Sequence, residues 1–246
     1  MGNIQFSKDI IDASKKAYFD IPKYRLKKPT LVLTCSSGVD SIASTHFLGK
    51  KFRSKSFERI VVFHYNHNLR KQNDLMQSNV EEFCKKFKFE LICSKAEFSG
   101  DKSEDACRKL RFNQLETLFE DSIIITSHHL NDCVESYLLN CFRGNPEYDP
   151  IPFYTVTYKG NVISHPFLFT SKNDFIQYAE RNNLYPYIVE DETNKNTVGS
   201  RRNMIRNKIV PILDQEEIGI NSIVKRKMTQ KLAKIIGNDC DIVLAD

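Results

Sequence analysis

The amino-acid sequence predicts an α/β fold, a Rossmann-like parallel sheet with helices on both faces, followed by a short α-helical C-terminal appendage. Four short runs rich in β-branched and aromatic residues alternate with segments of helical periodicity, which is the pattern of a parallel sheet. Polar residues follow three of these runs directly, at the strand ends where parallel sheets bind their ligands. After Gly144 the alternation stops, and Pro-rich, hairpin-like and basic segments follow.

The first half of the chain supplies the alternating elements. The expected strands cover residues 30–35, 59–66, 89–94 and 122–127, and the expected helices cover residues 40–50, 74–87, 103–119 and 131–142. Ser103 is a suitable N-cap for the third helix, because Glu104 and Asp105 would then lie at the positive end of the helix dipole.

The second half predicts a different arrangement. Lys159-Gly160-Asn161 is typical of a hairpin turn, and a helix is expected over residues 171–182. A polar loop then leads into a basic helix that ends at Pro211, and a tail helix covers residues 221–236. We divide the chain into a basic N-terminal helix or arm (1–28), an α/β core (29–145), a hairpin and helices that complete the core (146–214), and a short basic helical tail (215–246).

Composition narrows the class of protein. The seven cysteines form no CxxC pair, which favours reduced thiols and a cytoplasmic location. No apolar run approaches the roughly 18 residues of a membrane span, so no membrane partner is expected. Basic residues concentrate in 15–28, 199–208 and 225–234, and the formal net charge is +5. Each segment alone is compatible with a solvated face, whereas the three together favour an RNA partner.

The turn after the first strand reads Ser36-Ser37-Gly38 and leads into a helix. Backbone N–H groups, two hydroxyls and the positive end of the helix dipole would converge there, which suits a phosphate or pyrophosphate group. Gly38 would let the backbone approach the ligand closely. No lysine follows in the loop, so this is not a GxxxxGK[ST] motif. An ordinary capped strand–helix turn with an exposed Asp40 or Ser41 remains the alternative.

The segment SSGVDS, residues 36–41, resembles the SGGxDS signature of the PP-loop ATP pyrophosphatases, which adenylate a carbonyl oxygen and release pyrophosphate. The resemblance implies the PP-loop fold and an ATP-binding role for the core, residues 29–145. Ser37 stands where the family usually has glycine, and its side chain is tolerated there if the local φ is negative.

Further segments resemble the tRNA(Ile)-lysidine synthetases, a family within that superfamily. They are HYNHNLR at 64–70, EDACRKLRFNQL at 104–115, TSHHLNDCVESYLLNCFRG at 126–144, HPFL at 165–168 and EDETNKNTVGSRRNMIRNKIVPIL at 190–213. Three more departures from the family pattern are Asn68 for Gly, Asn131 for the first Asp, and His165 for Arg. Members usually carry C-terminal tRNA-binding domains, so a 246-residue chain is expected to be a minimal, mostly catalytic form.

The resemblance implies a ligase reaction with ATP and Mg²⁺. The C2 carbonyl of the wobble cytidine in the anticodon loop of an isoleucine tRNA is adenylated and pyrophosphate leaves. Free L-lysine then attacks C2 through its ε-amine and AMP leaves. The sequence leaves the oligomeric state open, a dimer included.

Residue chemistry and the resemblance together select the candidate site. Asp40 suits Mg²⁺, a hard cation that prefers carboxylate and phosphate oxygens. Asp132 and Glu135, at i and i+3, suit a lysine ammonium, a metal or a proton in transfer. The nucleotide-binding candidates are Ser36, Ser37, Gly38, Val39, Asp40, Ser41, Asn66, His67 and His129. The catalytic candidates are Asp40, Arg108, Arg111, His128, Asp132, Glu135, Arg202 and Arg206.

Several alternatives remain open at this stage. Asp132 with Glu135, and Arg108 with Arg111, are also compatible with solvated helix faces. Zinc at His64-x-x-His67 is disfavoured because no closed four-ligand spacing appears. The rival functions are a PP-loop tRNA thiolase, a catalytically weakened nucleotide- or RNA-binding homologue, and an adenylating synthetase that acts on a small acid.

Overall fold

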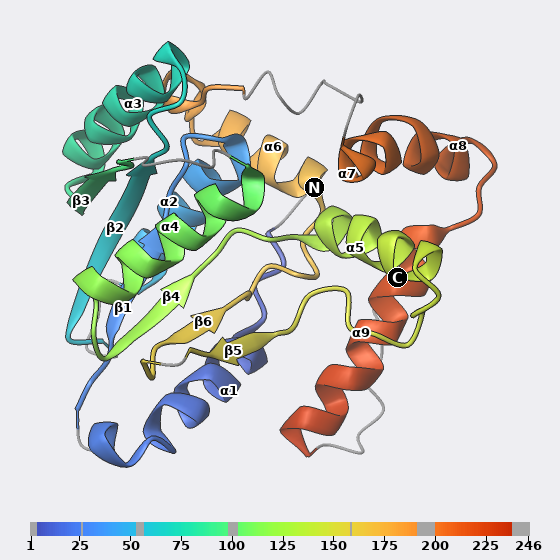
Figure 1. Ribbon diagram of the computed structural model, residues 1–246, viewed down its shortest axis with the longest axis horizontal. Helices are drawn as coiled ribbons and strands as arrows, with labels where there is room; N and C mark the ends of the chain where they lie inside the picture. The colour runs from blue at the N-terminus through green and yellow to red at the C-terminus, as the bar shows by residue number, and fades with distance from the viewer. Residues whose placement is uncertain are drawn as a thin grey trace.

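The computed structural model describes residues 4–25, 27–52, 57–97, 103–157, 159–190 and 200–237. Its centre is a six-stranded sheet of order β3-β2-β1-β4-β6-β5, in which only the β5–β6 pair is antiparallel (Figure 1). The strands are β1 Thr30–Thr34, β2 Arg59–Asn66, β3 Glu90–Lys95, β4 Ser122–Ile125, β5 Tyr154–Val156 and β6 Val162–Ser164. The predicted α/β class and the mostly parallel sheet are therefore confirmed.

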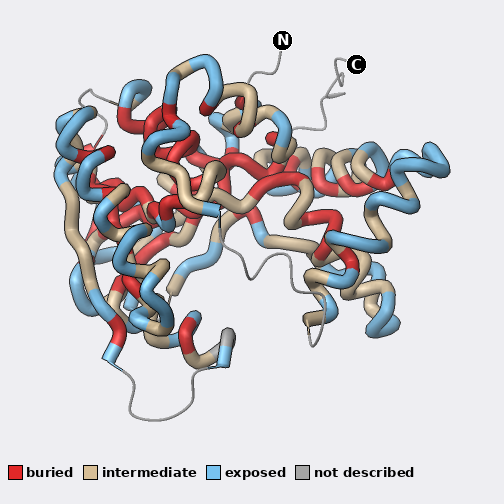
Figure 2. Tube along the Cα trace, turned by 90° about the horizontal axis from the view of Figure 1, so that it is seen from above, coloured by how far each residue is buried: buried red, intermediate tan, exposed pale blue. Residues whose placement is uncertain are grey.

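The central strands are apolar on both faces, as expected of strands covered by helices on each side. Leu31, Leu33 and Ile123 point to one face and join a core cluster with helices α1 (Lys8–Phe19) and α2 (Val39–Lys51). Val32 and Ile124 point to the other face and pack against α4 (Glu104–Leu118). Figure 2 shows buried residues concentrated in the sheet and along the inner sides of the helices.

The helices of the described residues are α1 Lys8–Phe19, α2 Val39–Lys51, α3 Lys71–Phe87, α4 Glu104–Leu118, α5 Leu130–Phe142, α6 Lys172–Arg181, α7 Arg201–Met204, α8 Val210–Gln215 and α9 Ile220–Ile236. Helices α2, α3, α4, α5, α6 and α9 agree with the predicted segments to within a few residues at their ends. Ser103 is the N-cap of α4, and its hydroxyl accepts a hydrogen bond from the Ala106 N–H at 3.3 Å. The side chains of Glu104 and Asp105 lie outside the described residues.

The N-terminal helix α1 is part of the core. Its residues Ile10, Ile11 and Tyr18 are fully buried, and the helix packs against β5 and β6. The Ser14 hydroxyl donates to Ser164 Oγ on β6 at 2.8 Å, so a buried polar contact fixes the helix on the sheet. The outer face of α1 carries its lysines.

The predicted hairpin forms from β5 and β6, and it extends the parallel sheet, which was not predicted. Strand β6 pairs in parallel with β4, with Ile123 opposite Val162, and so adds the hairpin to the edge of the sheet. The sequence pattern indicates a hairpin but carries no information about which distant strand it joins. In this position β6 brings the following residues, 165–172, to the end of β4.

The prediction that a basic helix ends at Pro211 is wrong. The helical path runs from α7 through a π turn, Ile205–Ile209, into α8, which continues to Gln215. Pro211 lies in the first turn of α8, where the missing N–H of proline is tolerated. The Val210 N–H donates to the Ile205 carbonyl across the π turn. The polar loop predicted before this helix lies largely outside the described residues, since 191–199 are not described.

The tail helix α9 packs along α5. Val224, Met228 and Leu232 are buried against a second core cluster that includes Val134 and Phe153. This packing supports the outer side of α5, whose N-terminal end carries candidate site residues. Among the described residues, no helix has the length and hydropathy needed to cross a lipid bilayer.

Candidate functional site

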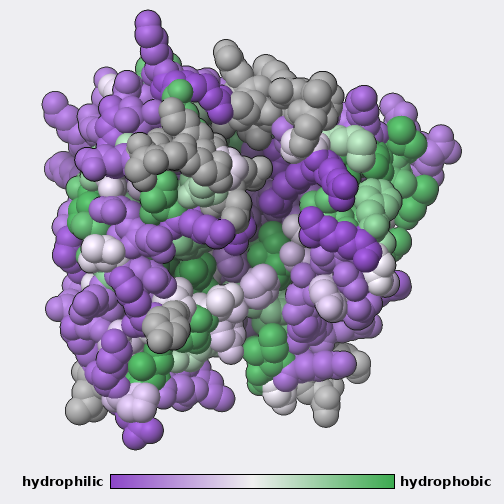
Figure 3. All heavy atoms as spheres, viewed as in Figure 1, coloured by the Kyte–Doolittle hydropathy of each residue, from purple (hydrophilic) through white to green (hydrophobic). Residues whose placement is uncertain are grey.

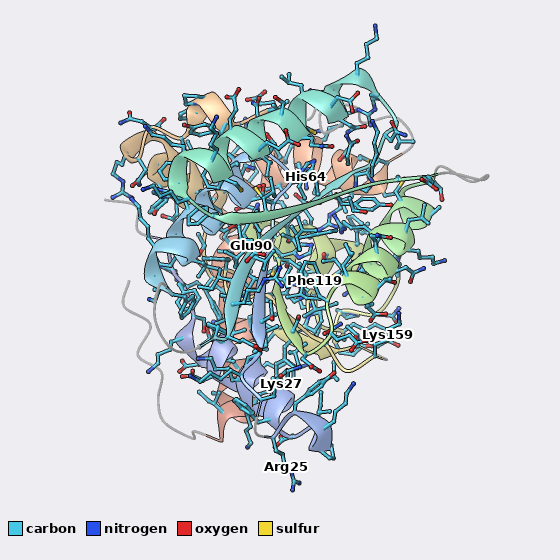
Figure 4. The ribbon with its side chains drawn as sticks, turned by 90° about the vertical axis from the view of Figure 1, so that its left-hand side faces the viewer. Arg25, Lys27, His64, Glu90, Phe119 and Lys159 are labelled. Carbon is cyan, nitrogen blue, oxygen red and sulfur yellow. The ribbon has the colours of Figure 1, made fainter. Side chains whose placement is uncertain are left out.

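Most of the candidate residues lie at the carboxyl ends of β1 and β4, where α2 and α5 begin. Figure 1 shows these two strands and the helices that follow them. The space-filling view shows a hollow between the part of the molecule that carries α6 and the part that carries α7, with hydrophilic residues in its upper region (Figure 3). His64 lies near the carboxyl end of β2, and Figure 4 shows Lys27 and Arg25, which precede β1, at the opposite end of the sheet. The site therefore occupies the edge at which parallel sheets bind ligands.

The loop after β1 is closed by Ser41. The Ser36 N–H donates to Ser41 Oγ at 3.0 Å, and the Ser41 hydroxyl donates to the Gly38 carbonyl at 2.9 Å. Gly38 is the N-cap of α2, and no side-chain cap is recorded for this helix within the described part of the chain. The first N–H groups of α2 thus point to the site, which is the arrangement that binds anions at helix N-termini.

The backbone of Ser37 does not have the negative φ that would accommodate its side chain. Its φ is 68°, in the left-handed region that favours glycine, so a negative φ does not explain how the side chain is tolerated. Instead the buried hydroxyl donates to the Tyr187 carbonyl at 2.8 Å, and the Val189 N–H donates to the Ser37 carbonyl at 2.9 Å. Asn68, the second departure from glycine, also has a positive φ of 52°, which asparagine adopts more readily than most residues.

His129 connects the two carboxylates Asp40 and Asp132. Its Nε2 lies 3.6 Å from Asp40 Oδ2 and 3.5 Å from Asp132 Oδ2, and the side chain is buried. Burial alone would lower the pKa of His129, but the two carboxylates raise it. Burial would raise the pKa of Asp132, but His129, His128 and Arg202 lower it to about 2. The His129 imidazole therefore lies between two carboxylates that favour its protonated form, and it joins the loop after β1 to the start of α5.

Glu135 is held by two arginines from the π-turn region. Arg202 Nε donates to Glu135 Oε2 at 2.8 Å, and Arg206 Nε donates to Oε1 at 2.6 Å. The Glu135 side chain is 4% exposed, and these two arginines are the cations that pair with it inside the protein. Nη2 atoms of Arg202 and Arg206 also lie 3.5 Å and 3.8 Å from Asp132 Oδ1. All four candidates are therefore brought together.

His128 and His165 form a pair around Thr126. The Thr126 hydroxyl is hydrogen-bonded to Nδ1 of both histidines, and the two Nδ1 atoms lie 3.3 Å apart. Burial lowers the pKa of His128 to about 4 and that of His165 to about 3, with nearby arginines acting in the same direction. Both rings are neutral at pH 7, so one Nδ1 donates while the other accepts.

Arg108 and Arg111, on α4, lie near the two histidines. Among the described residues, neither arginine forms an ion pair. The charge of Arg108 lowers the pKa of His165, and the charge of Arg111 lowers that of His128. Both guanidinium groups lie near the ring of Phe112, at 5.6 Å and 5.3 Å from its centroid. Positive charge is thus available on the α4 side of the site.

Asn66 and His67, at the end of β2, make contacts with neighbouring residues of the fold. The buried Asn66 amide donates to Asp74 at 3.0 Å and to Gln77 at 2.9 Å, and its carbonyl oxygen accepts from the Asn68 N–H. His67 packs edge-on against Tyr65, with 5.0 Å between ring centroids. The Asn66 side chain therefore stabilises the loop. Its amide N–H groups and its amide oxygen already have hydrogen-bond partners, so a contact with nucleotide would have to share or replace one of them.

Sequence reasoning missed three residues of the site. Lys172 Nζ lies 2.7 Å from Asp40 Oδ2, and Thr126 organises the histidine pair. The Asn131 amide oxygen accepts the Lys172 N–H at 2.9 Å. Lysine and threonine are common on surfaces, and nothing in their spacing signals a partner tens of residues away. Asn131 was visible only as a departure from the family pattern.

Comparisons with known proteins identify a domain family and several relatives of this chain. The family of the PP-loop domain matches residues 8–213. A tRNA(Ile)-lysidine synthase from Staphylococcus aureus is 27% identical over 207 residues, which is 80% of this chain and 47% of that protein. One from Buchnera aphidicola is 30% identical over 192 residues, 77% of this chain and 42% of that protein. The chain thus spans less than half the length of these relatives.

A solved structure shows the same fold. The U34-tRNA thiolase NcsA from Methanococcus maripaludis, with its [4Fe-4S] cluster, superposes with a TM-score of 0.64 at 14% identity, covering 91% of this chain and 78% of that one. At that identity the likeness concerns the fold alone. The family match, in contrast, covers most of the chain and includes the loop after β1 and the residues of α5 and α7. This chain belongs to the PP-loop domain family.

Proposed function

We propose that the protein uses ATP to attach lysine to C2 of a cytidine in the anticodon loop of an isoleucine tRNA. The observation that carries this proposal is the contact of His129 with both Asp40 and Asp132, because the loop after β1, which we propose binds phosphate, then lies beside a second carboxylate. The named activity of the curated relatives supports the choice of tRNA and lysine. Pyrophosphate leaves in the first step and AMP in the second.

The loop between Ser36 and Ser41 would hold the ATP phosphates. Its N–H groups and the start of α2 provide donors, and Gly38 leaves space at the surface of the loop, where an added Cβ would meet Ser36 Oγ at 3.5 Å. Asp40 Oδ1 is buried without a hydrogen-bond partner in the described part of the chain, which fits a carboxylate ligand of Mg²⁺. Mg²⁺ bound there would neutralise phosphate charge, with the remaining ligands drawn from phosphate and water oxygens.

Asp132 is the group that best fits the ammonium of the incoming lysine. Its pKa of about 2 keeps it anionic at pH 7, so it attracts a cation strongly and accepts a proton poorly. Neutral His128, beside Thr126, is the better placed acceptor for the proton that the amine must lose before it attacks. Glu135, whose oxygens are already bound by Arg202 and Arg206, would act as a positioning residue for those arginines.

The arginines supply positive charge where negative charge develops. Arg202 and Arg206 lie on one side of Asp132, and Arg108 and Arg111 lie on the side of the histidine pair. During adenylation, charge moves onto the departing pyrophosphate, and fixed cations stabilise that change because they need no reorganisation. The same residues suit the phosphates of a bound RNA strand.

The proposal is tested by separating the two half-reactions. Wild-type protein with ATP, Mg²⁺ and unmodified isoleucine tRNA should release pyrophosphate, and AMP should follow only when lysine is added. Asp132→Asn should keep the pyrophosphate step and lose most of the lysine-dependent AMP release. Asp214→Asn, at an exposed position on α8, is the matched control and should behave as wild type. Release of pyrophosphate without tRNA would point instead to a small-molecule substrate.

Sulfur transfer is the second candidate, favoured by the fold shared with a tRNA thiolase. It requires reactive thiolates. Cys35, next to the phosphate loop, and Cys133, in α5, are buried, and burial raises the pKa of both thiols. They are therefore protonated at pH 7. Cys35→Ser and Cys133→Ser proteins that retain full activity would exclude a role for these thiols, whereas a thionucleoside product would replace the lysine proposal.

A further inference from the structure

Lys172 brings a cation to a phosphate-binding loop that has no lysine in its own sequence. Its Nζ lies 2.7 Å from Asp40 Oδ2, although the two residues are 132 positions apart. The side chain is 42% exposed, so the ammonium faces the open side of the site rather than the protein interior. The Asp40 side chain is 25% exposed, so the ion pair joins a mostly buried carboxylate to an ammonium at the edge of the site.

The backbone of Lys172 is held firmly. Its N–H donates to the Asn131 amide oxygen at 2.9 Å, and the neighbouring Thr170 carbonyl accepts from the Leu130 N–H at 2.8 Å. Ser171 caps α6 and shares a reciprocal capping box with Asp174. The first turn of α6 is thereby fixed to the start of α5, and the lysine reaches the site from a rigid support.

The surroundings of the ammonium form an anion site. The start of α2, with Gly38 as its N-cap, lies on one side, and His129 Nε2 lies 3.6 Å from the same Asp40 oxygen. His129 Nδ1 is buried, and no hydrogen-bond partner for it exists among the described residues, while the residue is 6% exposed. An unsatisfied buried donor or acceptor of this kind is costly unless a ligand or water completes it.

The two oxygens of Asp40 therefore have different surroundings. Oδ2 contacts Lys172 and His129, whereas Oδ1 is buried and without a partner in the described part of the chain. One carboxylate can thus ligate a metal ion through one oxygen while the other orients two cations. A bound phosphate near Gly38 would offer the ammonium an acceptor that carries more charge than Asp40 does.

We propose that Lys172 is the phosphate-binding lysine of this site. Its ammonium rests on Asp40 in the free protein, binds the β- or γ-phosphate of ATP, and remains with pyrophosphate as the bond to the α-phosphate breaks. No proton or electron moves through Lys172 in this step, because the ammonium acts only as a fixed cation. The inference rests on the proposed use of ATP but not on the identity of the nucleophile or of the RNA.

The test compares nucleotides that do or do not carry the outer phosphates. Isothermal titration calorimetry with ATP and with AMP, in the presence of Mg²⁺, is performed on the full chain and on Lys172→Met. We expect the variant to bind ATP about tenfold to a hundredfold more weakly, since it loses a charge-assisted contact. AMP binding should stay within about twofold, because AMP has no outer phosphates to lose.

Matched variants separate this role from a structural one. Lys172→Arg keeps the charge and should recover part of the preference for ATP over AMP. Lys85→Met, at an exposed position in the last turn of α3, should leave both affinities unchanged. Equal weakening of ATP and AMP, or no weakening of either, would overturn the proposal, as would wild-type protein that binds ATP no better than AMP. A wild-type protein that prefers ATP yet adds no lysine to tRNA would contradict the proposed function and leave this inference standing.

Discussion

Arg206 donates hydrogen bonds to both carboxylate oxygens of Glu135, from Nε to Oε1 at 2.6 Å and from Nη2 to Oε2 at 2.9 Å. Arg206 lies in the π turn between α7 and α8, and Glu135 lies in the second turn of α5. A bidentate pair of this kind fixes orientation as well as distance. It therefore sets how the segment after residue 200 lies against the helix that carries Asp132.

Replacing Glu135 should loosen that attachment. In Glu135→Gln the two arginines lose a charged partner while remaining close to one another, and we expect the free energy of unfolding to fall by about 2 kcal/mol. The arginine side chains are 33% and 34% exposed, so water offsets part of the loss. Urea denaturation measures this effect, with Glu147→Gln at an exposed position as the control. A change as small as that of the control would show that the pair does not hold the segment.

Ser37 offers a measurement of backbone strain at the phosphate loop. Ser37→Gly removes the side chain from a position with φ of 68° and also loses the hydrogen bond to the Tyr187 carbonyl. Strain relief and bond loss are each about 1 kcal/mol, so the stability should stay near that of wild type. Ser37→Ala keeps the strain and loses the bond, and should be about 1 kcal/mol less stable than either. An alanine variant more stable than the glycine variant would refute this explanation.

The histidine pair should make the protein sensitive to acid. The pKa values of His128 and His165 are lowered to about 4 and about 3 in the folded state, against an ordinary value of 6.5. Between pH 6.5 and 4 the unfolded chain therefore binds more protons than the folded one, and the free energy of unfolding decreases as pH falls. This contribution is fully present above pH 6.5 and is lost toward pH 4.

A substitution isolates this contribution from the carboxylates that also titrate. His165→Asn keeps a polar group near Thr126 but removes one titrating ring. We expect the variant to lose less stability than wild type when urea denaturation is carried out at pH 7 and then at pH 5. Parallel loss in both proteins would mean that the pair is not the source of the acid sensitivity.

The parallel sheet and its helices were predictable because local patterns determine them. Alternating apolar runs and helical periodicity predict four strands and four helices, which the structure confirms, and the Ser and Gly residues of the loop after β1 are compatible with an anion site. The family resemblance then selected the residues of α5 and α7. The structure places Asp40, Asp132 and Glu135 in one connected group through His129, Arg202 and Arg206.

What could not be predicted depends on contacts between distant segments. The positive φ of Ser37 accompanies hydrogen bonds to residues 187 and 189. The helix continues through Pro211 because a π turn precedes it, and no residue type in the sequence indicates such a turn. The contact of Lys172 with Asp40 requires β6 to pair with β4, which the hairpin sequence does not specify. Neither the roles of the individual site residues nor the predicted division of the chain follows from fold alone.

Analysis of the product tests the central claim most directly. Unmodified isoleucine tRNA is incubated with the protein, ATP, Mg²⁺ and isotopically labelled lysine, then digested to nucleosides and examined by mass spectrometry. We expect a labelled lysine adduct of cytidine that is absent without ATP and strongly reduced with Asp132→Asn. Cytidine that stays unmodified while ATP is consumed, or a sulfur-containing nucleoside in its place, would contradict it.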